Sequence, residues 1–217
     1  MFATRRSALI ALGAVAALAA PVVALAANAQ AKTEEPKYEV AAKHEGFEVR
    51  TYAPRIVAEV QVKGDAKAAS SAGFRLLADF IFGNNTAKAE VAMTAPVDRS
   101  QNIAMTAPVD RSKTKDTWTI AFTMPSKYTL KTLPQPNNDR VKIREVPSTR
   151  FAVMRFSGNP NEESVQKRMK ALETLVGDAG YSTAGKPPVY ARYDPPWTIS
   201  FLRRNEVFLE LAPVPKA

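Results

Sequence analysis

The sequence predicts an α+β domain in which antiparallel strands form a sheet or open barrel with two helices on one side. Three observations lead to this fold class. Several segments alternate apolar and polar residues with a period of two, which is typical of half-buried strands. Two other segments repeat apolar residues three or four positions apart, as amphipathic helices do. The order strands, helix, strands occurs twice, which indicates two similar halves.

The first half is predicted to begin with strands and to continue into a helix. The alternating segments cover residues 38–40, 47–52 and 56–63, with a turn at Gly46 and a break at Pro54. Asp65 can then cap a helix, because its carboxylate can accept from the first free amides. The segment 83–85, Gly-Asn-Asn, is a typical helix end. We therefore expect one amphipathic helix that covers a sheet.

The second half repeats this pattern. A strand is predicted over residues 117–124, where Pro125 stops it, and further strands near 141–146 and 150–156. Asn159 is the expected cap of the second helix, with Pro160 at its first position and an end within 177–180. The last predicted strands cover residues 189–193, 197–202 and 206–211.

One apolar segment occurs twice in tandem. Residues 91–100 (VAMTAPVDRS) return as residues 103–112 (IAMTAPVDRS). The two copies could form a hairpin, or one copy could hold a sheet position while the other forms a loop. Met93 and Met105 are soft side chains that could line an apolar ligand or ligate a haem iron, although each taken alone is better explained as core filler.

The N-terminus has the pattern of a secretory signal peptide. Arg5 and Arg6 precede an apolar run, and small residues at Ala-x-Ala sites follow it. We expect a signal peptide at residues 1–26 with cleavage near 26 or 31, a disordered linker at 27–36 and a single domain at 37–217. An uncleaved membrane anchor is the alternative, and the paired arginines also resemble a twin-arginine signal. The expected location is periplasmic or secreted, with no stable membrane span after processing.

Composition excludes several classes of function. The chain of 217 residues has no cysteine, so disulfides, thiolate nucleophiles and cysteine-based metal sites are excluded. The net charge of +9 suits acidic ligands, but the basic residues are spread along the chain, so a solubilising surface is at least as good an explanation. Export makes nucleic acid the least expected partner.

No complete set of catalytic residues is present. His44 is the only histidine; it could ligate iron or act as a base, but in a turn it is better explained as a solvated residue. Serine-protease-like or metal-hydrolase chemistry would need this one histidine in every scheme. The segments 194–197 and 203–206 are explained by a rigid turn and a surface ion pair. We therefore predict a binding protein and not an enzyme.

At this point the motifs resemble a known family, the SOUL haem-binding proteins. The resemblance runs from about residue 37 to 211 in the right order, and the motifs that carry it are FEVRTY at 47–52, GFRLL at 73–77, GNN at 83–85, IAMTAPV at 103–109, FTMPS at 122–126, FSG at 156–158, YDPPW at 193–197 and FLRRNE at 201–206. It implies two βαβ-type halves that form a distorted antiparallel barrel with two helices, similar to gyrase-inhibitor-like effector-binding domains. It also implies binding of haem or another tetrapyrrole without catalysis.

The resemblance implies a site without the family's axial histidine. Some members carry a histidine after the position of Arg50, where this chain has Thr51. Binding would then rely on an apolar cleft with basic groups on the propionates. The candidate residues are Arg50 and Arg75 as charge partners and Phe74, Leu77, Met93, Met105 and Phe122 as walls.

The predicted function is an exported, monomeric haem-binding or tetrapyrrole-binding protein that sequesters or transports its ligand. The alternative is a general carrier of amphiphilic small molecules for which haem binding is incidental. An enzyme acting on such a ligand is the weakest hypothesis, because its acid, base and nucleophile cannot be named.

Overall fold

The computed structural model describes residues 33–101 and 117–213, and from Glu34 onward they belong to one compact unit. The predicted signal peptide, the linker up to residue 32 and the second MTAPV copy with Met105 lie outside the described residues. Within the described residues, no helix is both long and apolar enough to cross a membrane.

The described elements follow one another in two runs of similar order. The first run is β1 (Tyr38–His44), β2 (Phe47–Tyr52), β3 (Arg55–Lys63), α2 (Ala66–Ile81), β4 (Val97–Gln101) and β5 (Thr117–Thr123). The second run is β6 (Lys142–Val146), β7 (Thr149–Ser157), α3 (Glu162–Asp178), β8 (Val189–Arg192), the 3-10 turn η1 (Ser200–Leu202) and β9 (Arg204–Glu210).

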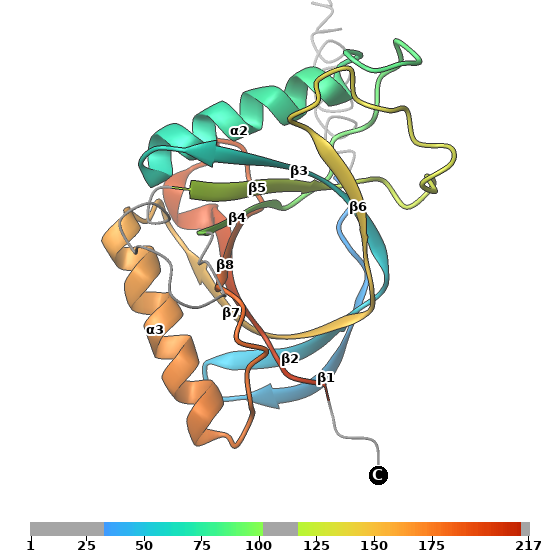
Figure 1. The fold of residues 1–217 in the computed structure, drawn as a ribbon. Helices are drawn as coiled ribbons and strands as arrows, with labels where there is room; N and C mark the ends of the chain where they lie inside the picture. Colours follow the sequence, from blue (N-terminus) through green and yellow to red (C-terminus); the bar gives the residue numbers. More distant parts are fainter. Residues whose placement is uncertain (1–32, 102–116, 214–217) are drawn as a thin grey trace, which may run out of the picture. The chain divides into compact units, whose positions relative to one another are not determined.

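The strands form a single curled sheet in the order β1-β2-β7-β9-β8-β4-β5-β3-β6. Every pairing between neighbours is antiparallel. Figure 1 shows α2 and α3 on the outside of this curl, each against the strands of its own half. In the first half, α2 connects β3 to β4, and β5 lies between these two strands in the sheet. In the second half, α3 connects β7 to β8, and β9 lies between them. The predicted α+β fold of two βαβ-type halves in a distorted barrel is confirmed.

Each helix covers its half of the sheet with a separate apolar core. Leu77 on α2 packs with Ile120 and Phe122 on β5, and all three are almost fully buried. Leu172 on α3 packs in the same way with Val207 on β9. Because strand side chains alternate between faces, the residues between these core positions point to the inner face of the curl. The helices therefore leave the inner face for other contacts.

The helix ends follow the capping rules, and one predicted cap residue is corrected. The Asp65 carboxylate accepts from the amides of Lys67 and Ala68 as predicted, and Gly83 after the end of α2 has a φ of 113°. The cap of α3 is Asn161 and not the expected Asn159, because the Asn161 side chain accepts from the amide of Ser164. The helix thus begins two residues later than Pro160 suggested, with acidic residues in its first turn, where the helix dipole favours them.

The predicted strand over residues 197–202 is wrong. Two prolines precede this segment, and the Arg203 guanidinium donates to the carbonyls of Pro196 and Thr198, which holds the chain in a compact loop. The large apolar side chains of this loop are exposed, Trp197 by 83%. The alternating pattern therefore did not reflect a half-buried strand.

The duplicated segment contributes to the sheet through its last residues. In the first copy Thr94 and Pro96 lie outside strands, and β4 begins at the next residue, Val97. The Thr94 hydroxyl donates to the Thr123 carbonyl, which ties the segment to the end of β5. The proposed hairpin between the copies stays a prediction, because the second copy lies outside the described residues.

Gly73 lies where α2 packs tightly against Ile120 of β5, and this predicts a specific cost of adding a side chain. A Cβ at this position would lie 2.7 Å from Cβ of Ile120 and closer still to its Cγ1. We expect Gly73→Ala to lower the free energy of unfolding by about 1–2 kcal/mol, because overpacking outweighs the gain in helix propensity. Urea denaturation measures this change.

The matched control is Gly177→Ala on α3. A Cβ there meets no atom within 4 Å, so only the helix-propensity gain remains and stability should rise by about 0.5–1 kcal/mol. Equal effects of the two substitutions would show that the contact between Gly73 and Ile120 is not tight.

Candidate functional site

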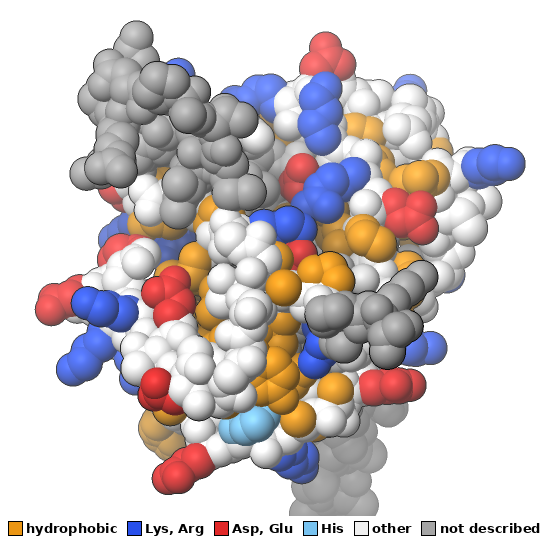
Figure 2. All heavy atoms as spheres, turned by 60° about the horizontal axis from the view of Figure 1, so that its bottom comes forward, with side chains coloured by type: hydrophobic (Ala, Val, Ile, Leu, Met, Phe, Trp, Pro, Cys, Tyr) orange, Lys and Arg blue, Asp and Glu red, His pale blue; other side chains and the backbone are white. Residues whose placement is uncertain are grey.

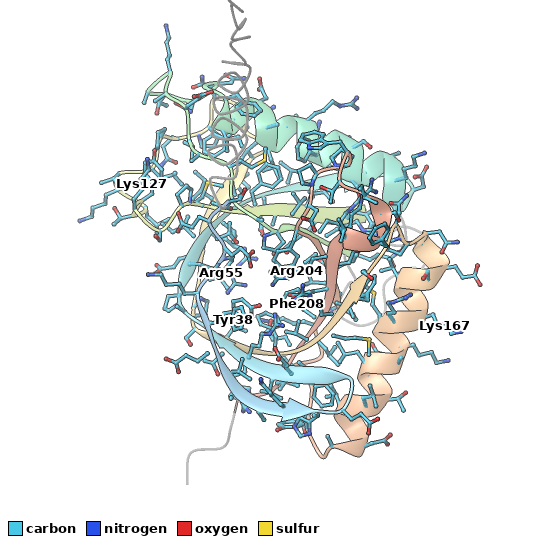
Figure 3. All side chains as sticks on the ribbon, turned by 180° about the vertical axis from the view of Figure 1, so that it is seen from behind. Tyr38, Arg55, Lys127, Lys167, Arg204 and Phe208 are labelled. Carbon is cyan, nitrogen blue, oxygen red and sulfur yellow. The ribbon has the colours of Figure 1, made fainter. Side chains whose placement is uncertain are left out.

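The inner face of the curled sheet carries an aromatic cluster and a set of charged side chains. Figure 3 shows Tyr38, Arg55, Arg204 and Phe208 pointing into the space that the strands enclose, whereas Lys127 and Lys167 point away from it. The rings of Tyr52, Phe151 and Phe208 pack together with centroids 5.8–6.0 Å apart. They come from β2, β7 and β9, so the alternation of these strands brings the rings to one face.

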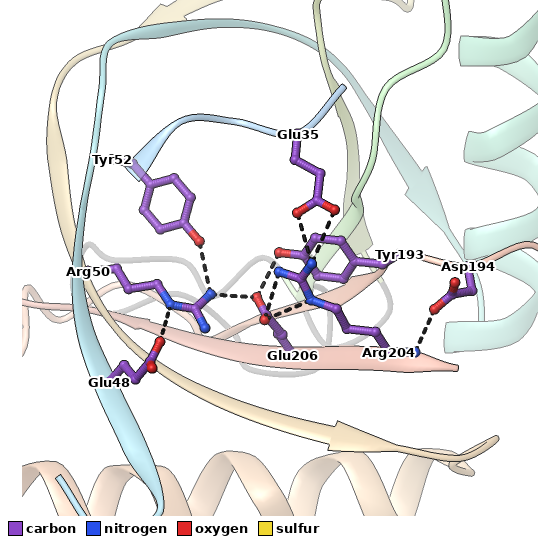
Figure 4. A network of polar contacts seen from close by, with 8 residues as sticks. All are labelled: Glu35, Glu48, Arg50, Tyr52, Tyr193, Asp194, Arg204 and Glu206. Atoms are coloured by element: carbon purple, nitrogen blue, oxygen red, sulfur yellow. Dashed lines mark hydrogen bonds and ion pairs between the residues drawn. The ribbon is translucent and has the colours of Figure 1, made fainter. Parts of the chain in front are cut away.

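Glu206 on β9 is the centre of the polar network shown in Figure 4. Its side chain is completely buried. The carboxylate accepts from Arg50 Nη1 at 3.0 Å, from the Tyr193 hydroxyl at 2.7 Å and from Arg204 Nε at 3.0 Å. A buried carboxylate is stable only when such donors replace its water, so these contacts explain how the charge is tolerated.

Arg50 on β2 is held from several sides. Its Nε donates to Glu48 at 2.8 Å, and its guanidinium lies 4.5 Å from the centre of the Tyr38 ring. Burial by itself lowers the pKa of Arg50, but its hydrogen bond to Tyr52 and the charge of Glu206 outweigh burial and raise the pKa. Burial raises the pKa of the Tyr52 hydroxyl to about 12. Arg50 is therefore a permanent cation whose Nε and Nη1 already have partners.

Arg204 connects this network to the segment before β1. Its Nη1 donates to both carboxylate oxygens of Glu35, at 2.9 and 3.1 Å, while its Nε and Nη2 contact Glu206. The guanidinium stacks 3.7 Å from the centre of the Tyr193 ring. Burial raises the pKa of the Tyr193 hydroxyl, and the charge of Glu206 raises it further. The Asp194 carboxylate accepts from the Arg204 amide, which fixes the start of β9.

Asp98 and Arg55 are two further ionisable side chains near the inner face. No ion pair within 4 Å joins them in the described structure. Burial raises the pKa of Asp98 to about 7, although the positive charge of Arg55 opposes this shift. Burial likewise lowers the pKa of Arg55. Arg55 Nη1 has no hydrogen-bond partner among the described residues. Both side chains line a small cavity of about 40 Å³ together with the aromatic cluster.

A larger cavity of about 560 Å³ lies at the end of the sheet where β3 and β5 meet the segment before β1. Apolar side chains of its lining include Ile56, Met124 and Leu130, and its cations are Lys37, Arg55 and Lys131. Glu34, Glu35 and Glu145 also line it. Arg55 and Pro36 line both cavities, so the two spaces are neighbours.

The residues predicted for the site lie in different places. Arg50 belongs to the network around Glu206. Phe74 and Phe122 contact each other with ring centroids 5.4 Å apart, in the region where Leu77 is buried between α2 and the sheet. Arg75 is exposed on α2, and Met93 is 38% exposed in the loop before β4. None of these described residues lines either cavity.

Sequence reasoning missed the role of Glu206, Arg204 and Tyr193. It assigned Arg204 and Glu206 to a surface ion pair, but Glu206 is completely buried and Arg204 is 18% exposed. The alternation of β9 contained a usable signal. Positions 204, 206 and 208 share one face, so an arginine and a glutamate share it with Phe208, which indicates a buried pair.

Iron coordination by histidine is not available at the larger cavity. His44 stacks on Phe47 at the far end of β1 and contacts the Tyr181 hydroxyl at 3.1 Å, and it does not line the cavity. Among the described residues, no group of three or more histidine, cysteine, aspartate or glutamate side chains could hold a metal ion. Tyr128 and Met124 do line the cavity, and phenol and thioether groups are known haem ligands.

Surface charge does not mark a binding face in the view of Figure 2. Basic and acidic side chains are interspersed on the face that it shows, with hydrophobic side chains between them. A mixed surface of this kind favours solubility and does not select a strongly anionic partner. The face in Figure 2 therefore gives no charge signal for a ligand.

Comparisons with known proteins identify the family. A family model described as SOUL heme-binding protein matches residues 33–210, so the chain belongs to the SOUL haem-binding family. Haem or tetrapyrrole binding is the role of this family. A comparison with curated proteins found no match.

Solved structures share the fold. The EcmrR C-terminal domain superposes with a TM-score of 0.57 at 13% identity, over 82% of this chain and 99% of that one. A hydrolase from Listeria innocua superposes with a TM-score of 0.52 at 11% identity, over 79% of this chain and 94% of that one. At these identities the likeness concerns the fold alone.

The position of Glu206 predicts a large cost of removing its charge. Glu206→Gln should lower the free energy of unfolding by about 2–4 kcal/mol, because Arg50 and Arg204 would lose their shared buried anion. Chemical denaturation measures the loss. Glu59→Gln is the control, since Glu59 pairs with an Arg144 side chain that is 53% exposed and should cost less than about 1 kcal/mol. Similar losses would contradict a special role of Glu206.

The raised pKa of Asp98 predicts a pH-dependent stability. The unfolded carboxyl titrates near its ordinary value of 3.8 and the folded one near 7. Between these values the folded state holds a proton that the unfolded state has lost, so this group makes stability fall as pH rises. Asp98→Asn should remove the fall and be more stable than the wild type by at least about 1 kcal/mol at pH 8.

Denaturation at several pH values between 4 and 8 measures this difference. The control is Asp139→Asn, because Asp139 is exposed in a turn and should leave the pH profile unchanged. A profile for Asp98→Asn that runs parallel to that of the wild type would show that Asp98 titrates normally.

Proposed function

We propose that the chain is an exported, monomeric protein that binds haem or a related tetrapyrrole in the 560 Å³ cavity and sequesters or transports it. The observation that carries this proposal is the presence, in a member of a haem-binding family, of an open cavity of suitable size. Binding sites for small molecules commonly have volumes of about 300–1,000 Å³. Space for a flat ligand is thus available without rearrangement of the two helical cores.

The chemistry of the lining supports an amphiphilic anion. Ile56, Met124 and Leu130 offer apolar contact for a macrocycle, and ammonium groups of Lys37 and Lys131 can pair with carboxylates at the rim. The acidic residues of the rim disfavour carboxylates next to them, so the propionates should turn toward the lysines. This arrangement holds an amphiphilic ligand in one preferred orientation.

The cavity also contains two groups that could coordinate iron. Tyr128 could bind through its phenol oxygen, and Met124 through its sulfur. Bound haem would supply its own absorbance and redox chemistry, whereas this chain would bind it, orient it and limit its contact with water. No acid, base or nucleophile is needed for that role.

Export completes the proposal. Its support is the basic N-terminus followed by an apolar run and Ala-x-Ala sites. A haem-binding protein outside the cytoplasm would keep a sparingly soluble ligand in solution. N-terminal sequencing of the mature protein would show whether cleavage occurs near residue 26 or 31.

Filling the cavity should abolish hemin binding. Ala53 lines the cavity and is itself exposed, so Ala53→Trp places a large ring in the space without disturbing the cores. We expect a loss of hemin affinity of tenfold or more, measured by titration of the Soret band. Ala41→Trp is the control, because Ala41 is also exposed but does not line the cavity.

The same titration separates the proposal from a general carrier of amphiphiles. A saturable Soret shift at one-to-one stoichiometry, lost in Ala53→Trp and kept in Ala41→Trp, supports a tetrapyrrole site in this cavity. Broad absorbance without saturation would contradict it and favour the carrier of other amphiphilic small molecules. Equal binding by both variants would place the haem site elsewhere.

A further inference from the structure

The segment Glu34–Lys37, called the strap below, crosses from the larger cavity to the inner face of the sheet. Its residues line the 560 Å³ cavity, and Pro36 also lines the small cavity between the aromatic cluster and Asp98. In Figure 4 Glu35 reaches from this segment to Arg204 within the network. The strap therefore borders both spaces.

Few contacts hold the strap in place. The Glu34 carbonyl accepts from the Ala95 amide at 2.9 Å, and the Glu34 carboxylate accepts from the Ser126 amide at 2.9 Å. The Lys37 carbonyl accepts from the Ala53 amide at 3.1 Å. Glu34 and Lys37 are themselves exposed. The strap adds no apolar side chain to either helical core, so its release would leave the cores intact.

The Glu35 carboxylate occupies the one part of Arg204 that the network does not use. Nε and Nη2 of Arg204 contact Glu206, whereas Nη1 donates to both oxygens of Glu35. Tyr193 stacks on the guanidinium and Asp194 fixes its backbone, so Arg204 would keep its position without Glu35. A guanidinium held in this way is well suited to bind a carboxylate.

We propose that Arg204 is a carboxylate-binding subsite that Glu35 fills in the ligand-free protein, and that a ligand carboxylate replaces Glu35 when the strap leaves. The ligand class is an aromatic or polycyclic carboxylate. Its carboxylate pairs with Arg204, and its flat part lies against the aromatic cluster of Tyr52, Phe151 and Phe208. This inference extends the proposed cavity toward the inner face, but it does not require that the ligand is haem.

The first test measures strap release without any ligand. In Glu35→Gln, the amides of Ala53, Ala95 and Ser126 should exchange with deuterium roughly tenfold faster than in the wild type, because each donates to the strap. Amides in the middle of β3 should not change. Glu39→Gln is the matched control, since Glu39 is an exposed residue of β1. Unchanged exchange at all three amides would overturn the idea that Glu35 holds the strap.

The second test measures the subsite with pyrenebutyrate, a flat aromatic carboxylate, in the full chain. Glu35→Gln should bind it roughly tenfold more tightly than the wild type, because the internal competitor is weakened. Arg204→Lys keeps the positive charge needed by Glu206 but loses the planar guanidinium, and it should bind the probe several-fold more weakly. Pyrenebutanol, which lacks the carboxylate, should not respond to Arg204→Lys.

The decisive result is that Glu35→Gln raises the affinity for pyrenebutyrate and Arg204→Lys lowers it. If the ion pair only stabilised the fold, both variants would lose stability and neither would bind the probe more tightly. Weaker or equal binding by Glu35→Gln would therefore overturn the subsite. If the subsite fails, a loss of hemin binding in Ala53→Trp would still support the proposed haem cavity. The two proposals can therefore fail separately.

Discussion

The structure depends on a buried carboxylate, Glu206, which lies between two guanidinium groups inside a curled sheet. Arg50 reaches it from β2 and Arg204 from its own strand, while Tyr193 donates from the end of β8. Each of these contacts offsets part of the cost of removing a charge from water. Because the donors come from separate strands, the network also connects the strands that enclose the inner face.

This arrangement explains why the two faces of the sheet differ. The outer face is covered by α2 and α3 through ordinary apolar packing, for which the hydrophobic effect alone is sufficient. Among the described residues no helix covers the inner face, which carries ion pairs and a small aromatic cluster. Polar groups of this kind leave specific donors and acceptors near a cavity, whereas an apolar core would close it.

The fold is shared with domains of low sequence identity, so the ligand chemistry must come from the residues of this chain. Thr51 follows Arg50 here, and the described lining of the larger cavity contains Tyr128 and Met124 but no histidine. The strap adds a carboxylate of the chain itself to the same region. In the proposed subsite a ligand carboxylate competes with Glu35 for Arg204.

The sequence by itself predicted both helices, most of the strands and the fold class, because periodicity and capping are local properties that reach over a few residues. It misjudged residues 197–202, where two preceding prolines and the contacts of the Arg203 guanidinium with nearby carbonyls override the alternation. It also placed Glu206 at the surface. Only the tertiary structure decided which strands are neighbours, and so brought together Glu35, Arg50 and Glu206, which are far apart in the chain. Burial and cavities arise from that pairing, and a local pattern does not encode it.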